Sequence, residues 1–179
     1  MGDVETVAEV RSFEQFFRAE YRSLVALGAW LTGDRATGED LAQDALRTAH
    51  GRWGAVSGYE RPGTFVRRVV INLASNERRR RGRERAAVGR LTVAAESSAP
   101  GPAMAEPDPL WAEVAALPMQ QRAAIGLRYL EDRTTAEIAE ALECSEATVR
   151  VHLHRAHRRL AERLGCSTDS LEPFEQEPT

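Results

Sequence analysis

Carboxylates that can do acid–base or metal chemistry cluster at one point in the sequence. Glu39, Asp40 and Asp44 fall within the run GEDLAQD, and such groups act as general acids and bases or as ligands of divalent cations. Asp40 and Asp44 are four residues apart and share one face of a helix, whereas Glu39 points elsewhere. Because the three carboxylates do not converge, the pattern favours an acidic helix that docks on a basic partner protein. A merely solvated helix face is the alternative.

Histidine and cysteine side chains near the C-terminal end offer a second kind of chemistry, zinc binding. His152, His154 and His157 lie close together, and Cys144 and Cys166 flank them. On a helix, His152 and His154 face different directions, and the two cysteines lie beyond opposite ends of that helix. No phosphate-binding glycine loop or nucleophile motif occurs either. The sequence therefore predicts no metal site, no cofactor and no catalytic residue.

Charge is segregated along the chain. Residues 3–44 hold nine acids and four arginines, a net charge of −5, whereas residues 61–90 hold ten arginines and two acids, a net charge of +8. An acidic block beside a basic block indicates two different partners, one of them a polyanion.

The basic block interleaves its arginines with aromatic and amide side chains, namely Tyr59, Phe65, Asn72 and Asn76. Phosphates attract arginine, and the bases of single-stranded DNA stack on aromatic rings and hydrogen-bond to amides. The block is therefore a candidate for binding single-stranded DNA. A solvated basic helix end is the alternative.

A short helix, a tight turn and a longer helix are predicted in the last third of the chain. Thr134 and Glu137 have the spacing of a capping box, and Ser145 is placed to cap the longer helix. Ala139 and Val149 lie ten residues apart, as the small and apolar residues at a helix-turn-helix crossing do. Arginine on such a helix can bind guanine or phosphate, and a solvated amphipathic helix is the alternative. The expected outward face is Arg150, His152, His154, Arg155, His157, Arg158 and Arg159.

The rest of the chain also has helical periodicity and no convincing strand. Apolar residues recur at helical spacing in three further stretches. The first starts at Ser12, which is placed to cap a helix, and ends at residues 32–34. The second starts between Thr37 and Asp40, and the third at Pro62 after a loop over residues 54–63. The fold class is therefore all-α, with two small helical domains joined by a flexible linker. The expected bounds are 12–90 for the first domain, 91–107 for the linker, 108–164 for a four-helix second domain, and 165–179 for an acidic tail.

Length and composition limit the class of protein to which the chain can belong. The chain has 179 residues, of which 42% are hydrophobic and 28% are charged, as in ordinary globular proteins. No apolar run is long enough to span a membrane, and the N-terminus lacks the basic and apolar regions of a secretory signal. We therefore expect a cytoplasmic protein without membrane insertion, whose two cysteines are reduced thiols.

A series of motifs occurs in a specific order between residues 12 and 164. In the first half they are FEQFF at 13–17, LTGD at 31–34, EDLAQDAL at 39–46, and VRRVVINLA at 66–74 followed by four arginines at 78–81. In the second half they are LP at 117–118, LRYLED at 127–132, EIAE at 137–140, TVR at 148–150 and HRA at 154–156. In this order the motifs resemble the extracytoplasmic-function sigma factors, the smallest group of the sigma-70 family.

The resemblance implies a factor that binds RNA polymerase core, recognises the −10 and −35 elements of promoter DNA and aids DNA melting, without being an enzyme itself. The implied partners are the clamp helices and the flap of the polymerase, promoter DNA, and as a further candidate an anti-sigma factor. The residues implied for core binding are Asp40, Leu41, Gln43 and Asp44. Those implied for the melted −10 element are Tyr59, Arg61, Phe65, Arg67, Arg68, Asn72, Asn76, Arg79 and Arg80. Those implied for the −35 element are Thr148, Arg150, Val151, His152, His154, Arg155, Arg158 and Arg159.

Two other classes of protein fit parts of the pattern. A DNA-binding regulator that acts without polymerase can carry the second domain alone, but a receiver or ligand-binding domain would add strands. A nucleic-acid-modifying hydrolase needs acids or metal ligands within the basic face, where only Glu77 and Glu84 occur. Glu143 stands in the turn where the family commonly has glycine, so we expect a left-handed residue that costs about 1 kcal/mol there.

Overall fold

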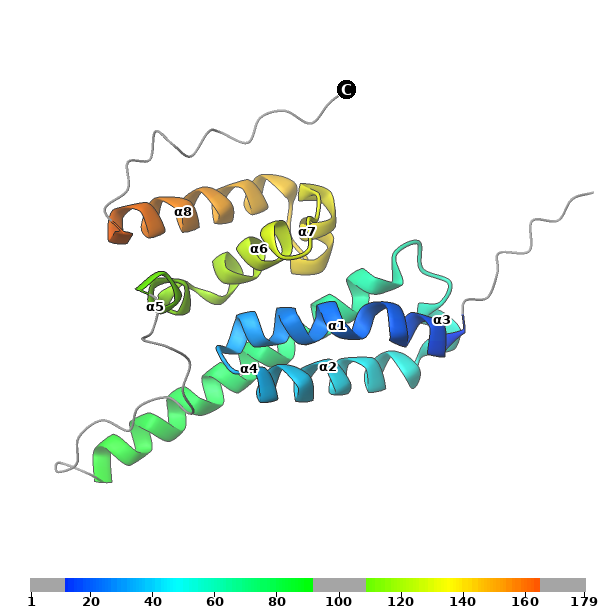
Figure 1. Cartoon of the computed structure of the whole chain (residues 1–179), viewed down its shortest axis with the longest axis horizontal. Helices are drawn as coiled ribbons and strands as arrows, with labels where there is room; N and C mark the ends of the chain where they lie inside the picture. The colour runs from blue at the N-terminus through cyan, green and yellow to red at the C-terminus, as the bar shows by residue number, and fades with distance from the viewer. Residues whose placement is uncertain (1–11, 92–108, 165–179) are drawn as a thin grey trace, which may run out of the picture.

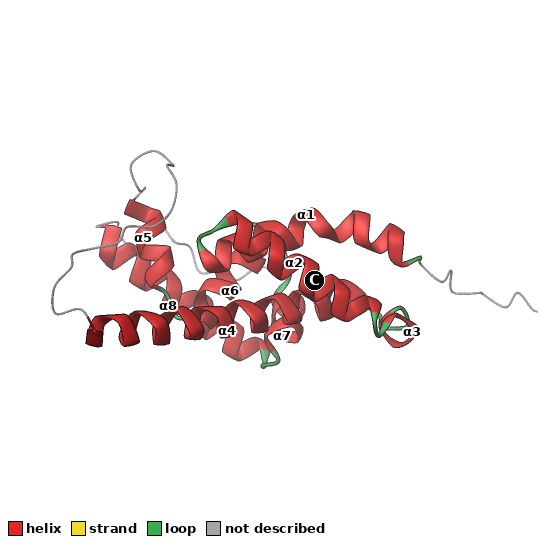
Figure 2. Cartoon of the chain, turned by 90° about the horizontal axis from the view of Figure 1, so that it is seen from below, coloured by secondary structure: helices red, strands yellow, loops and turns green. Residues whose placement is uncertain are grey.

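The computed structural model describes residues 12–91 and 109–164, and this part of the chain is all helical, without a strand (Figures 1 and 2). The helices are α1 (Phe13–Thr32), α2 (Arg35–His50), α3 (Trp53–Val56), α4 (Pro62–Leu91), α5 (Pro109–Ala116), α6 (Met119–Tyr129), α7 (Thr135–Leu142) and α8 (Glu146–Leu164). The all-α class and the four-helix second domain are confirmed. The predicted linker, residues 91–107, begins at the last residue of α4, and its other residues and the acidic tail lie outside the described residues. Within the two described segments, no helix is both long enough and apolar enough to cross a bilayer.

Local chemistry sets several helix ends as the sequence predicts. Ser12 caps α1 by accepting a hydrogen bond from the backbone N–H of Gln15 at 3.2 Å. Thr134 and Glu137 satisfy each other's backbone N–H groups in the predicted capping box of α7. Gly33 ends α1 in the left-handed region, with φ 77°, a conformation that glycine adopts without a steric penalty.

Two boundaries differ from the prediction. Helix α2 begins earlier than Thr37, because the carboxylate of Asp34 accepts a hydrogen bond from the Thr37 N–H at 2.8 Å and so acts as the cap. The expected loop over residues 54–63 is interrupted by the single turn α3. That turn is too short to show a helical period, and the burial of its Val56 in the core holds it.

Two glycines allow α1 and α2 to cross closely. A Cβ built on Gly28 would lie 2.9 Å from the Cα of Gly38, and one built on Gly38 would overlap the backbone nitrogen of Ala29. Since both neighbours are backbone, neither helix can make room by a side-chain rotation. The crossing therefore fixes α2, with its acidic residues, on α1.

The two domains pack against one another in one continuous apolar core. Helix α1 contacts α6, and α4 contacts α7, in addition to the contacts within each domain. In Figure 1 the second domain covers α1, while α2 lies on the other side of α1. Trp30 marks the junction, because its indole N–H donates to the carbonyl of Arg122 at 2.9 Å.

Replacing Gly38 with alanine tests the helix crossing. We expect Gly38→Ala to lower the free energy of unfolding by about 1–3 kcal/mol, because the added methyl group overlaps a backbone that cannot move aside. The matched control is Gly82→Ala in α4, where no atom lies within 4 Å of the added Cβ. That control should gain up to about 1 kcal/mol from helix propensity. Urea denaturation followed by circular dichroism measures both, and equal shifts would contradict the argument.

Candidate nucleic-acid interface

Helices α7 and α8 and the turn between them form the predicted helix-turn-helix. Ala139 and Val149 are buried where the two helices pack. The backbone N–H of Cys144 donates to the carbonyl of Ala139 at 3.0 Å and closes the end of α7. Glu143 has φ 54° and ψ 45°, so the expected left-handed residue is confirmed. The turn thus holds α8 at a fixed angle to α7.

The outward face of α8 is cationic and exposed. Ser145 caps the helix by accepting a hydrogen bond from the Thr148 N–H at 3.2 Å, and Leu153 turns inward to the core. Arg150 lies 3.2 Å from Glu146, but exposed pairs of this kind contribute less than about 1 kcal/mol and yield readily to a phosphate. Of the residues predicted for the −35 element, Thr148 and His152 are half-buried, and the following are exposed: Arg150, Val151, His154, Arg155, Arg158 and Arg159.

Two histidines of α8 are held toward their neutral form. Burial and the charge of Arg155 lower the pKa of His152, and burial and His154 lower the pKa of His157. The Nε2 of His157 lies 2.8 Å from the Oη of Tyr129, and the two rings meet edge to face. His157 therefore packs on α6 instead of lying free on the outward face, which differs from the sequence-based expectation.

Helix α4 presents a second candidate surface. Asn72, Asn76 and Arg79 are exposed and lie three or four residues apart, so they share one face of the helix. Phe65 lies on the same face and meets the half-exposed ring of Tyr59 edge-on, with a centroid distance of 5.9 Å. Aromatic rings, amides and a guanidinium are therefore side by side, as a single-stranded nucleic acid requires.

Other arginines of α4 are already engaged. Arg80 lies 2.7 Å from both Glu77 and Glu84, and Arg81 lies 2.7 Å from Glu77 and donates to the hydroxyl of Thr37. The hydrogen bonds from Arg80 and Arg81 lower the pKa of the Glu77 carboxyl. The charge of Arg80 is thus offset within the helix.

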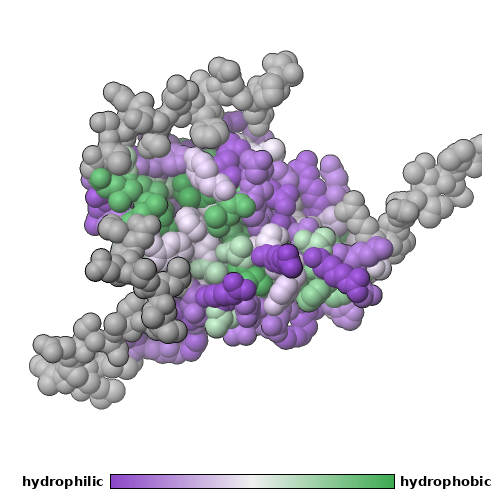
Figure 3. All heavy atoms as spheres, viewed as in Figure 1, coloured by the Kyte–Doolittle hydropathy of each residue, from purple (hydrophilic) through white to green (hydrophobic). Residues whose placement is uncertain are grey.

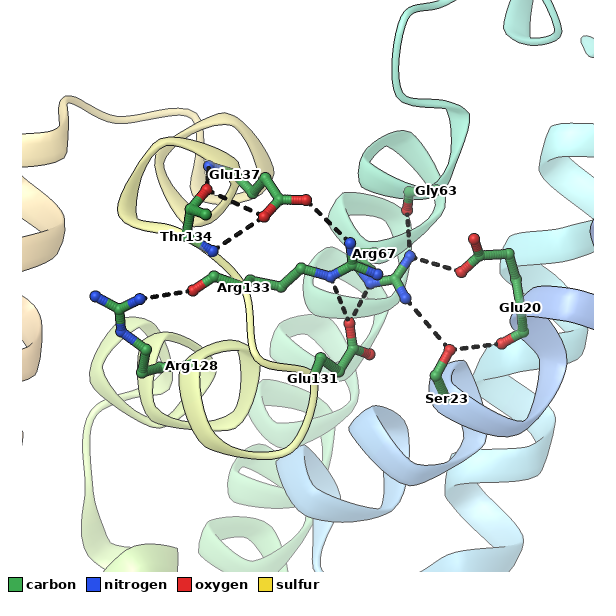
Figure 4. A network of polar contacts seen from close by, with 9 residues as sticks. All are labelled: Glu20, Ser23, Gly63, Arg67, Arg128, Glu131, Arg133, Thr134 and Glu137. Carbon is green, nitrogen blue, oxygen red and sulfur yellow. Dashed lines mark hydrogen bonds and ion pairs between the residues drawn. The ribbon is translucent and has the colours of Figure 1, made fainter. Parts of the chain in front are cut away.

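Arg67 lies on the opposite side of α4 and is only 3% exposed. Its guanidinium donates to Glu20 at 2.7 Å, to the carbonyl of Gly63 at 3.0 Å and to Glu131 of the second domain (Figure 4). Burial opposes its charge, but Glu131 and Glu20 outweigh burial and raise the pKa of Arg67. Arg61 and Arg68 lie at the edge of the α4 face, and carboxylates of α7 and its turn pair with them.

The acidic helix α2 supplies the third candidate surface. Asp40 and Gln43 are exposed, Asp44 is partly exposed and pairs with Arg47, and Leu41 is buried at 7% exposure. In the space-filling view, hydrophilic residues dominate the visible surface over α2 and α4 (Figure 3).

A groove beside the acidic face escaped the sequence prediction. It is lined by Phe13, Phe17, Tyr21, Gln43, Leu46, Arg47 and His50. Phe17 stacks on Tyr21 with a centroid distance of 5.2 Å, and Phe17 is 36% exposed. The signal was present in the spacing of the aromatic residues, which share a face of α1, but that spacing is also typical of a buried stripe.

The remaining chemistry in the described segments is sparse. No group of three histidine, cysteine or acidic side chains with the geometry of a metal site occurs among the residues that the structure describes. Cys144 is a free thiol, and burial raises its pKa. Together, the helix-turn-helix and the α4 face are features of a DNA-binding protein, all-helical in its described part, with two candidate nucleic-acid surfaces.

Comparison with known families gives this class a name. The model described as Sigma-70 region 2 matches residues 16–84, and the model described as Sigma-70, region 4 matches residues 108–160. The RNA polymerase sigma-E factor of Streptomyces coelicolor is 32% identical over 158 residues, which cover 88% of this chain and 89% of that protein. The ECF RNA polymerase sigma factor SigM of Mycobacterium tuberculosis is 26% identical and is matched over 86% of this chain and 78% of its own length.

A solved structure agrees with these matches. The sigma factor RpoE of Bartonella quintana, crystallised with the anti-sigma factor NepR, superposes with a TM-score of 0.67 at 25% identity, over 86% of this chain and 96% of that one. This chain belongs to the extracytoplasmic-function sigma factors of the sigma-70 family, which direct transcription initiation by RNA polymerase. Such factors regulate initiation and are not classical enzymes.

The two perturbed histidines make the stability of α8 depend on pH. A histidine whose folded pKa is lowered binds protons more readily in the unfolded state, so its contribution to stability is complete above about pH 6.5 and is lost as the pH falls below that value. We expect the melting temperature to fall between about pH 7.5 and pH 5.5, and to fall less in His152→Gln/His157→Gln. Thermal melts by circular dichroism measure this, and an equal fall in both proteins would contradict it.

Proposed function

We propose that this sigma factor uses three separate surfaces at the promoter: α8 for the −35 element, α4 for the melted −10 element, and α2 for the polymerase core. The observation that carries the proposal is that a cationic helix-turn-helix and an aromatic–amide–arginine face occur in one chain on different domains. A regulator that binds duplex DNA alone has no use for the second of these faces.

The −35 contact is supported by the chemistry of the α8 face. An α-helix fits the major groove of B-DNA, and its exposed arginines bind guanine edges or phosphates there. The exposed side chain of Val151 suits the methyl group of thymine. Exposed Arg155 and Arg159, which have no carboxylate partner among the described residues, suit phosphates on either side of the groove.

The −10 contact is supported by the α4 face. Tyr59 and Phe65 offer π surfaces on which unstacked bases rest, and Asn72 and Asn76 offer both donors and acceptors to base edges. A protein that binds the separated strand in this way favours melting, because it stabilises the open form of the DNA and not the duplex.

The core contact is supported by the position of α2 on the side of α1 away from the second domain (Figure 1). Asp40, Gln43 and Asp44 are accessible there, and the aromatic groove next to Gln43 extends the same surface with apolar area. Leu41 would act indirectly, since its buried side chain fixes α2 in the core. We propose that this surface takes the clamp helices and that the second domain contacts the flap.

Charge reversal on α2 tests the core contact. We expect Asp40→Arg/Asp44→Arg to weaken binding to purified core polymerase at least tenfold and to abolish run-off transcription from the DNA upstream of its own gene, because rim charges govern such encounters. Co-elution from a sizing column measures binding without any promoter. The control Glu162→Arg reverses a charge at the exposed end of α8, and it should co-elute like the unmodified protein. Co-elution of the double variant would disprove the assignment of α2.

Arg155 tests the use of α8 in duplex binding. We expect Arg155→Ala to weaken binding to a duplex of the upstream DNA and to reduce the slope of log affinity against log salt by about 1, because one phosphate contact is lost. Fluorescence anisotropy over a salt series measures both quantities. The control Arg18→Ala removes an exposed arginine of α1, and its slope should remain unchanged. A variant of Arg155 with an unchanged slope would exclude that phosphate contact.

A further inference from the structure

The seam between the two domains brings acids of the second domain to arginines of α4. Glu131 lies between α6 and α7, Glu140 lies on α7, and Glu143 forms the turn after α7. Their partners are Arg67, Arg61 and Arg68. All three arginines belong to the set that the family resemblance implies for the −10 element, so in that role the carboxylates of the second domain and the DNA would compete for the same cations.

The centre of the seam is a buried ion pair. The side chains of Arg67 and Glu131 are each only 4% exposed, and Glu20 of α1 completes the site at 2.7 Å from Arg67. Figure 4 shows Arg67 reaching across from α4 to Glu131, while Arg133 approaches the same carboxylate at 3.4 Å. Removing one partner of such a buried ion pair strongly destabilises a protein, because the other charge is left buried and uncompensated.

The edge of the seam is exposed and borders the nucleic-acid face directly. Arg68 lies 3.0 Å from the carboxylate of Glu143 and donates to the carbonyl of Glu140 at 2.8 Å. Arg61 lies 3.8 Å from the carboxylate of Glu140. Phosphates that approached this edge would meet two carboxylates and two arginines whose charge is already offset.

The far end of the seam is poorly compensated. Among the described residues, the buried guanidinium of Arg122 donates only to the carbonyls of Leu31 and Ala115. Burial together with the charge of Arg78 lowers the pKa of Arg122 to about 10. The Oε1 of Gln121 and the Nε of Arg122 are buried here without a hydrogen-bond partner in the described part of the chain, as is the Oε1 of Glu131 at the centre of the seam. Unsatisfied polar groups are costly, so this contact is better suited to opening than an ordinary core is.

We propose that the second domain acts as an internal competitor of single-stranded DNA. In the free protein Glu140 and Glu143 pair with Arg61 and Arg68 at the edge of the α4 face, and Glu131 holds the buried Arg67 behind that face. The seam opens when a DNA strand takes the place of the two exposed carboxylates. The proposal rests on the proposed −10 role of α4. It leaves α8 accessible throughout, so duplex binding at α8 does not require the opening.

Neutralising the two exposed acids gives the first test. The probe is a fluorescein-labelled single-stranded DNA of randomised sequence, about fifteen nucleotides long. We expect Glu140→Gln/Glu143→Gln in the full chain to bind it roughly three- to tenfold more tightly than the unmodified protein does, since both arginines become available. The control Glu14→Gln/Glu39→Gln removes the same charge from exposed pairs outside the seam. Equal affinities of the two variants would overturn the proposal.

A wedge in the seam gives the second test. A Cβ on Gly126 of α6 would lie 2.6 Å from the Trp30 ring of α1, so Gly126→Ala should separate the domains while favouring the helix itself. We expect a larger radius of gyration in X-ray scattering and tighter binding of the same probe, relative to the unmodified protein. Expansion without tighter binding would overturn the proposal. Failure of the −10 role would appear separately, as Asn72→Ala/Asn76→Ala leaving probe affinity unchanged in the expanded variant.

Discussion

One buried guanidinium, that of Arg67, joins three parts of the molecule. It bonds to Glu20 of α1, to the first turn of its own helix α4, and to Glu131 beyond α6. A charge removed from water is tolerated only when its partners are complete, so the positions of these elements are interdependent. The first domain supplies one carboxylate and the second supplies the other. The arrangement of both domains in this structure therefore depends on a site that looks, in the sequence, like part of a basic run.

Because the two domains meet at Arg67, the three candidate surfaces differ in how accessible they are to a partner. The outward face of α8 and the acidic face of α2 lie away from the seam, and each is exposed as a partner would need it. The α4 face is exposed at Asn72 and Asn76 but is bordered by carboxylates at Arg68. Under the proposed function, the polymerase is bound before the DNA is melted, so the α4 surface bordered by carboxylates is the last of the three to be used.

The sequence predicted what depends on local chemistry. The cap at Ser12 and the capping box at Thr134 are decided by residues within a few positions, and the structure bears them out. The left-handed Glu143, also confirmed, was expected from the glycine that the resembled family commonly has there. The cap at Asp34 was missed because Thr37 offers an equally good local signal, and α3 was missed because one turn shows no period. The burial of Arg67 was not predictable, since its partner Glu131 is 64 residues away and nothing near Arg67 distinguishes it from its exposed neighbours.

Few amino acids satisfy both structural requirements of position 143, one on its backbone and one on its side chain. Its backbone lies in the left-handed region, which glycine, asparagine and aspartate adopt most easily. Its side chain supplies the carboxylate for Arg68, which only aspartate and glutamate can do. Among the standard residues, aspartate alone is favoured on both counts, though its shorter side chain must still reach the guanidinium. The tolerance of this turn to mutation is therefore narrow, and glycine at this position would keep the backbone conformation but lose the ion pair with Arg68, leaving Arg68 only its hydrogen bond to the carbonyl of Glu140 across this edge of the seam.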